Sequence, residues 1–215
     1  MFKALMAVQW KWTKGAALVG TLVGFAIPLA SVQAIDSQAI SAVLVVERMQ
    51  EFGIAYALLA GGVGLAFALL AWSADHKGRH VYALALPIDR SRYAANRFGA
   101  GALFLLLPFL GVLAGSLLAV AMANIPMGLH FYPLSLSLRF LLASAVAFSI
   151  FFAVASSTPK AAGMILGSLA TVLIVAFFLS MVSIPFDLLG HVLNLLFNEP
   201  GPLSVFTGRW MLIDA

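Results

Sequence analysis

Five long apolar runs constrain this chain more than any other feature of its sequence. They are residues 15–34, 54–72, 98–123, 138–155 and 161–182. Each run is close to the roughly 20 apolar residues that an α-helix needs to cross the hydrocarbon core of a bilayer. Only 9% of the 215 residues are charged, against about 25% in a soluble domain. We therefore expect an all-α, polytopic membrane helix bundle, with residues 1–215 forming a single transmembrane domain of five spans.

The basic residues are divided unevenly between the two sides of these spans. Nine of the twelve lie on the side of the N-terminus: Lys3, Lys11, Lys14, Lys77, Arg79, Arg90, Arg92, Arg97 and Lys160. Three lie on the other side: Arg48, Arg139 and Arg209. Because loops rich in Lys and Arg remain in the cytoplasm, we expect a cytoplasmic N-terminus and a C-terminus outside. The expected location is the bacterial cytoplasmic (inner) membrane, with a multi-pass topology.

Residues 1–14 allow two interpretations. Together with the first apolar run they resemble a secretory signal, with Val-Gln-Ala before Ile35 as a cleavage site. On a helical wheel, however, the three lysines share one narrow arc, and Phe2 and Trp12 lie towards the other side. This pattern is typical of a helix lying in the membrane interface. We favour a retained interfacial helix.

The tail, residues 183–215, contains a short apolar segment near its start, residues 185–197. It is 13 residues long and is interrupted by polar residues and one glycine: Asp187, Gly190, His191 and Asn194. Apolar segments of about 10–14 residues are typical of re-entrant or interfacial pieces. We expect this segment to enter the outer leaflet and return, with no further span after residue 182.

Three spans contain Gly-x-x-x-Gly: Gly20/Gly24, Gly111/Gly115 and Gly163/Gly167. Without side chains at these points, helix backbones can approach one another closely. Such pairs serve either packing within one bundle or dimerisation, and we favour packing within the bundle.

The sequence offers little catalytic chemistry. It has no P-loop, no His-Glu-x-x-His and no Gly-x-Ser-x-Gly, and no acidic residue lies at the middle of a span, where it would indicate an ion relay. His76 and His80 are four residues apart and would share a helix face as metal ligands, but His also tolerates a hydrated loop in the headgroup region, and we favour the loop. Arg139, near the outer end of span four, is expected to extend outward to water. We expect neither an enzyme nor a bound cofactor or metal.

The most charged part of the chain is His76–Tyr93, which reads HKGRHVYALALPIDRSRY. Gly78 and Pro87 bracket a segment long enough for about two helical turns, and Pro87 should end that helix. Asp89 or Ser91 can then cap the helix that becomes span three. The pattern predicts a short surface helix held between two spans.

This loop resembles that of the permease subunits of type-2 ABC exporters. In those subunits the loop between spans two and three contains an acidic residue, a glycine, Leu-Pro and then Arg and Tyr. The matching residues here are Asp75, Gly78, Leu84, Leu86, Pro87, Arg90, Arg92 and Tyr93. The resemblance extends to the interfacial helix, to the turn within residues 155–167 and to the re-entrant segment, but the family has a sixth span where this chain has five. It implies that residues 76–93 form a coupling helix that fits into a groove of a separate ATPase subunit.

The resemblance implies the membrane-spanning permease subunit of an ATP-driven exporter, without a nucleotide site of its own. Its partners would be an ABC ATPase subunit, a second permease chain and membrane lipid, with no nucleic acid. The expected ATPase-coupling residues are Lys77, Gly78, Arg79, His80, Val81, Tyr82, Leu84, Pro87 and Arg90. A membrane scaffold or assembly protein without transport activity is the alternative; an intramembrane enzyme lacks paired catalytic groups.

Overall fold

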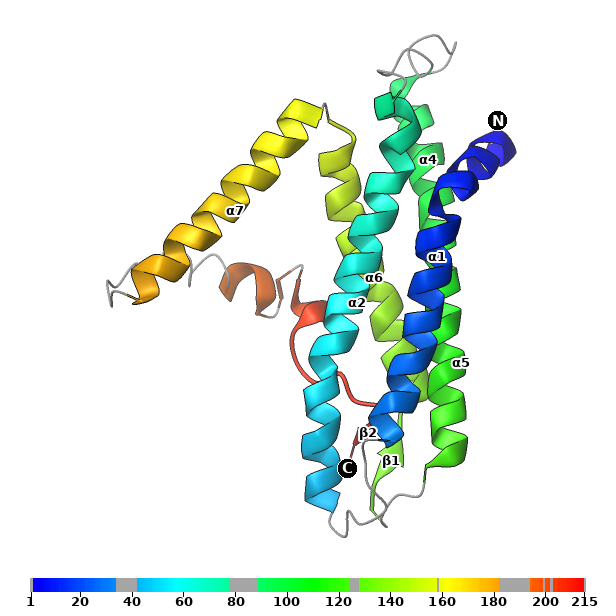
Figure 1. Cartoon of the computed structure of the whole chain (residues 1–215), viewed down its shortest axis with the longest axis vertical. Helices are drawn as coiled ribbons and strands as arrows, with labels where there is room; N and C mark the ends of the chain where they lie inside the picture. The colour runs from blue at the N-terminus through cyan, green and yellow to red at the C-terminus, as the bar shows by residue number, and fades with distance from the viewer. Residues whose placement is uncertain are drawn as a thin grey trace.

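The computed structural model describes residues 2–33, 42–77, 89–123, 128–157, 159–181, 194–198, 200–201 and 203–214. The chain forms a helical bundle with one helix projecting from it (Figure 1). The elements are α1 (Phe2–Gln33), α2 (Ala42–Lys77), α4 (Arg90–Phe104), α5 (Leu106–Met122), β1 (His130–Phe131), α6 (Pro133–Ala155), α7 (Pro159–Met181), the 3-10 helix η1 (Ser204–Phe206) and β2 (Ile213–Asp214). The expected all-α class is confirmed.

Four helical stretches in the described part of the chain are long and apolar enough to cross a membrane. They are α1, α2, α4 together with α5, and α6. The chain is therefore a multi-pass membrane protein. The fifth predicted span coincides with α7, which is helical over 23 residues but is not one of these four, so a fifth crossing stays a prediction.

Residues 2–14 are helical and continue without interruption into the rest of α1. Gln9 and Thr13 are buried on this stretch, and the ring of Trp10 lies 5.4 Å from that of Phe104 on α4. The N-terminal part of α1 thus packs along α4. Its placement in a membrane interface stays a prediction.

The contact between α1 and α5 depends on glycine. A Cβ atom at Gly111 would collide with the carbonyl oxygen of Thr21, and one at Gly115 with that of Phe25. Only residues without side chains allow the two backbones to come this close. The predicted role of this glycine pair in packing within the bundle is confirmed. A Cβ atom added at Gly163 or Gly167 on α7 would have nothing within 4 Å.

The tail packs back onto the bundle. β2 pairs antiparallel with β1, so that Ile213 lies opposite Phe131. Trp210 to Ile213 are buried, and the ring of Trp210 stacks at 6.3 Å on that of Tyr56 in α2. Of the predicted re-entrant segment 185–197, the described part is Asn194–Phe197, a single helical turn; the remainder lies outside the described residues.

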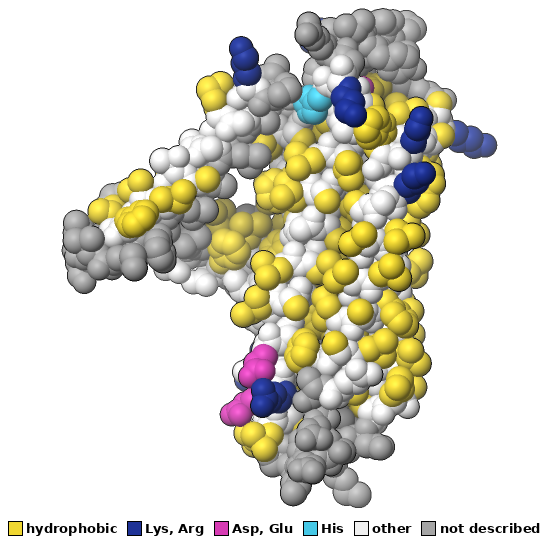
Figure 2. All heavy atoms as spheres, viewed as in Figure 1, with side chains coloured by type: hydrophobic (Ala, Val, Ile, Leu, Met, Phe, Trp, Pro, Cys, Tyr) yellow, Lys and Arg dark blue, Asp and Glu magenta, His cyan; other side chains and the backbone are white. Residues whose placement is uncertain are grey.

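The two ends of the bundle differ in charge. The N-terminus of α1, the C-termini of α2 and α6 and the N-terminus of α4 meet at one end, which we call the basic end. Figure 2 shows several Lys and Arg side chains around it, whereas at the opposite end of the visible face acidic side chains lie beside Lys or Arg. This separation follows from the loop charges that the sequence analysis counted.

Candidate functional site

The structure describes the two ends of the predicted coupling loop. Lys77 is the last residue of α2, and Arg90 is the first residue of α4. The other expected coupling residues lie outside the described residues: Gly78, Arg79, His80, Val81, Tyr82, Leu84 and Pro87. What the structure adds is the arrangement that holds the loop at its ends.

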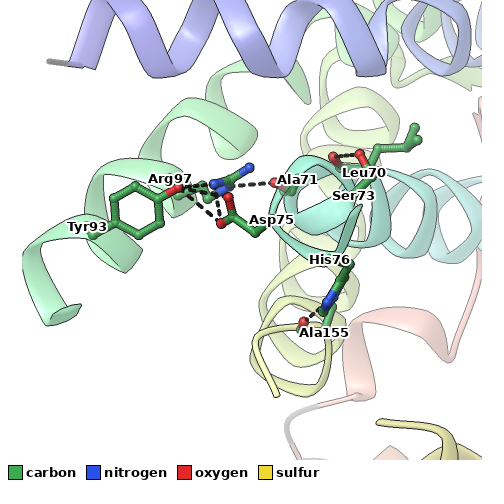
Figure 3. Close-up of polar contacts among 8 residues, drawn as sticks. All are labelled: Leu70, Ala71, Ser73, Asp75, His76, Tyr93, Arg97 and Ala155. Atoms are coloured by element: carbon green, nitrogen blue, oxygen red, sulfur yellow. Dashed lines mark hydrogen bonds and ion pairs between the residues drawn. The ribbon is translucent and has the colours of Figure 1, made fainter. Parts of the chain in front are cut away.

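A buried ion pair joins α2 to α4 at the basic end. Arg97 of α4 donates through Nη1 to Oδ2 of Asp75 on α2, and the two side chains are each 4% exposed. The hydroxyl of Tyr93 donates to both carboxylate oxygens of Asp75, at 3.0 and 3.2 Å. Arg97 also donates through Nε to the carbonyl oxygen of Ala71 at 2.5 Å and through Nη1 to the Tyr93 hydroxyl. Figure 3 shows these side chains converging between the two helices.

Helical spacing explains why these groups meet. Tyr93 and Arg97 are four residues apart on α4, and Ala71 and Asp75 are four apart on α2, so each pair lies on one face of its helix. The Trp72 ring lies 5.2 Å from the guanidinium carbon of Arg97 and contributes a cation–π contact. Burial of either charge without these partners would cost several kcal/mol. Separating α2 from α4 would therefore be unfavourable, because each charge would lose its partner. We call Asp75, Tyr93 and Arg97 the α2–α4 clamp.

The next two residues of α2 extend these contacts to two further helices. His76 lies with Nε2 3.0 Å from the carbonyl oxygen of Ala155, at the end of α6. Since a carbonyl can only accept, Nε2 carries the proton. Lys77 places Nζ 4.2 Å from the centre of the Trp12 ring on α1. Three consecutive residues of α2 therefore contact α4, α6 and α1 in turn.

His76 is thus a helix-to-helix contact in this structure. Among the residues that the structure describes, no three His, Cys, Asp or Glu side chains are grouped as a metal site would require. His80, its predicted companion, lies outside the described residues. The described contacts at the basic end hold helices together.

The start of α4 agrees in part with the sequence. Asp89 occupies the N-cap position, and its carbonyl accepts from the backbone N–H of Tyr93 at 3.0 Å. Its carboxylate, however, makes no capping hydrogen bond. The predicted helix start is correct, while the predicted side-chain cap at Asp89 is not formed.

Arg97 was missed as a site residue, because its charge was attributed to the basic loop. The signal was present in the sequence: Arg97 follows Tyr93 by one helical turn, just where an apolar span begins. A charged residue at that boundary needs a partner or a route to water. The structure shows that it has the partner.

Arg139 forms a second arginine site, at the opposite end. It donates through Nε to the carbonyl of Val205 at 3.1 Å, through Nη1 to that of Arg209 at 2.7 Å, and through Nη2 to that of Thr207. Its guanidinium carbon lies 4.9 Å from the ring centre of Trp210. The side chain therefore binds the C-terminal backbone. Its expected extension to water stays a prediction.

No protein-family model matches this chain, and neither a curated protein nor a solved structure matches it.

Proposed function

We propose that this chain is the membrane-spanning permease subunit of an ATP-driven ABC exporter. A separate ATPase subunit would bind residues 76–93, and two permease chains would form the pathway. The observation that carries the proposal is the α2–α4 clamp, which ties together the two helices that flank the predicted coupling loop. The clamp includes Asp75 and Tyr93, two residues of the motif on which the family resemblance depends.

A coupling loop works only if its motion reaches the helices that line the pathway. Asp75 immediately precedes the loop, Tyr93 is its last residue, and the two are hydrogen-bonded to each other. A push on the loop would then move α2 and α4 as one body, because neither helix end can shift without breaking a buried ion pair. Through His76 and Lys77 the same push would reach α6 and α1. ATP-driven closure of the partner would thus become a rigid-body movement of the bundle.

The proposal includes an orientation. The basic end carries the loop and would face the cytoplasm of a bacterium, where the ATPase is found, with the N-terminus inside. The excess of Lys and Arg at this end supports that assignment. The chain itself would contribute no nucleotide site and no cofactor.

The direct test is site-specific photo-crosslinking in the native membrane. A photoreactive amino acid replaces Tyr82 in the loop, and in a control variant it replaces Val43, which is 66% exposed at the opposite end. The expected result is a crosslinked ATPase containing a P-loop, identified by mass spectrometry, from position 82 and not from position 43. If position 82 yields no such ATPase at equal expression, the exporter proposal fails and the scaffold alternative replaces it.

Substitutions within the loop then measure how the partner is held. Tyr82→Ala should reduce ATPase co-purification more than Arg79→Ala. Truncating a buried aromatic anchor costs about 2 kcal/mol or more, whereas an exposed ion pair contributes about 0–1 kcal/mol. If both variants retain the ATPase at the wild-type level, residues 76–93 are only a basic anchor.

A further inference from the structure

A large apolar cavity lies beside the bundle, between α2, α6 and the C-terminal segment. Its volume is about 880 Å3. The α2 wall runs from Gln50 to Leu65, the α6 wall from Ala147 to Phe151, and the third wall includes Phe206 and Trp210. Glycines at positions 53, 61 and 62 keep the α2 wall open, and a Cβ atom at Gly62 would have nothing within 4 Å. The cavity falls in the range of about 300–1,000 Å3 that is typical of small-molecule sites.

The length of the cavity matches one leaflet of a bilayer. Gln50 and Leu65 are fifteen residues apart on α2, or about 22 Å at 1.5 Å per residue. Half of a bilayer including its headgroups measures about 20–22 Å. Glu47, Arg48 and Glu51 lie just before the apolar run of α2, which places Gln50 at headgroup depth. The cavity therefore runs from the headgroup region to near the bilayer centre.

The cavity is exposed to lipid. Ile54 and Leu58, which line it, are 69% and 70% exposed, and both lie within the membrane-crossing part of α2. An apolar hollow at this depth gives water no hydrogen-bond partners. Acyl chains are apolar and therefore suit such a hollow.

Two polar side chains line the headgroup end, Gln50 and Arg209. The Arg209 side chain is 64% exposed and forms an ion pair with Asp214, whose Oδ1 lies 3.7 Å from its Nη1; this distance is too long for a hydrogen bond, so the N–H groups of Arg209 are not used by the pair. The neighbouring Arg139 already donates to three backbone carbonyls. Arg209 is thus the arginine whose donors can turn to an anion at the mouth of the cavity, and guanidinium suits phosphate oxygens.

We propose that this cavity binds a phospholipid from the leaflet at the opposite end of the bundle. The phosphate lies against Arg209 and Gln50, and one acyl chain lies along α2 from Gly53 to Leu65. The acyl chain gains little by leaving other lipid, because both surroundings are apolar. Affinity therefore depends on the charge-assisted hydrogen bonds to the phosphate. The proposal requires no ATPase and stands apart from the exporter proposal.

The test is native mass spectrometry of the purified full chain, released from detergent micelles after incubation with one of two lipids. Dioleoyl phosphatidylglycerol carries the phosphate, and dioleoylglycerol has the same acyl chains without it. Wild-type chain should retain one phosphatidylglycerol and at least about tenfold less dioleoylglycerol, equivalent to about 1.4 kcal/mol. Arg209→Gln should abolish that preference.

Cavity-filling variants test the position of the acyl chain. At Gly61, a Cβ atom points to within 3.9 Å of the Phe206 ring across the cavity, so Gly61→Leu should lower phosphatidylglycerol retention at least about tenfold. Gly163→Leu is the matched control, since Gly163 lies on α7 with nothing within 4 Å. Ala57→Leu, a second filler on the same wall, serves if Gly61→Leu misfolds by circular dichroism. The proposal would be overturned if the folded filler variants retained the lipid undiminished, or if the two lipids were retained equally. It would also be overturned if the wild-type chain formed a dimer without lipid, because a second copy would then cover the cavity.

Discussion

Removing one partner of the α2–α4 clamp should destabilise the protein strongly. Asp75→Ala leaves the Arg97 guanidinium, 4% exposed in the ion pair, without its carboxylate. Loss of one member of a buried ion pair costs about 3–5 kcal/mol, which corresponds to a rise of roughly a hundredfold to several thousandfold in the unfolding equilibrium constant. Tyr93→Phe removes only the hydroxyl that donates to the carboxylate, and should cost less, about 1.5–3 kcal/mol.

The double variant Asp75→Leu/Arg97→Met separates the charge from the packing. Apolar replacement of a whole buried ion pair is commonly neutral or stabilising by about 1–4 kcal/mol. The double variant should therefore recover most of the stability that Asp75→Ala loses. The assay is unfolding of the purified chain by increasing SDS in mixed micelles, followed by far-ultraviolet circular dichroism.

Two results would refute this reasoning. If Asp75→Ala costs less than about 1 kcal/mol, the pair behaves as an exposed salt bridge does, and the helices are not held together by it. If the double variant is as unstable as the sum of Asp75→Leu and Arg97→Met measured singly, the two side chains contribute independently. In either case the clamp would not be the stiff link that the exporter proposal needs.

Three further predictions concern orientation, helix packing and the C-terminal segment. A cysteine placed at Arg79 in this cysteine-free chain should react with an impermeant maleimide only after cells are permeabilised; labelling of intact cells would reverse the proposed orientation. Gly115→Leu should lower the yield of folded protein severalfold, because a Cβ there already collides with α1, whereas Gly167→Leu on α7 should not; equal yields would contradict the role of α5. Arg139→Leu leaves three backbone carbonyls without their donor and should speed amide hydrogen exchange in residues 205–213 at least about tenfold; unchanged exchange would mean that the segment is held by its apolar contacts alone.

Four of the five predicted spans and the Gly111/Gly115 contact were predictable because they depend on local pattern. An apolar run of about 20 residues identifies a span wherever its neighbours lie, and a missing Cβ marks a close approach whichever helix provides the partner. Gly111 and Gly115 show this, since the sequence placed them in a helix contact without indicating that α1 would be the other side. Element bounds were less accurate, because α2 begins at Ala42, twelve residues before the predicted span.

The clamp was only partly predictable, because it depends on how two helices are rotated. Asp75 and Tyr93 were identified by their motif, as residues of the coupling loop. Their contact, across 18 residues of sequence, required α2 and α4 to turn these faces towards each other. Arg97 carries the charge that makes burial of Asp75 tolerable, and a tally of loop charges cannot distinguish such a residue from one that only anchors the loop to the membrane surface.

The partners of Arg139 were not predicted for a different reason, which concerns the backbone. An arginine near the end of a span usually reaches water, and nothing near Arg139 in the sequence suggests otherwise. The C-terminal segment, however, passes its η1 beside Gly61, seven residues into the apolar run of α2 that begins at Ile54, and its chain from Thr207 to Arg209 is neither helix nor strand. Irregular backbone is tolerated at membrane depth only where protein groups satisfy it. A guanidinium with five N–H donors can satisfy several carbonyls at once, and Arg139 does so for residues 66 to 70 positions away. The carbonyls that need a donor belong to the C-terminal segment. The residues next to Arg139 in the sequence therefore give no sign of them.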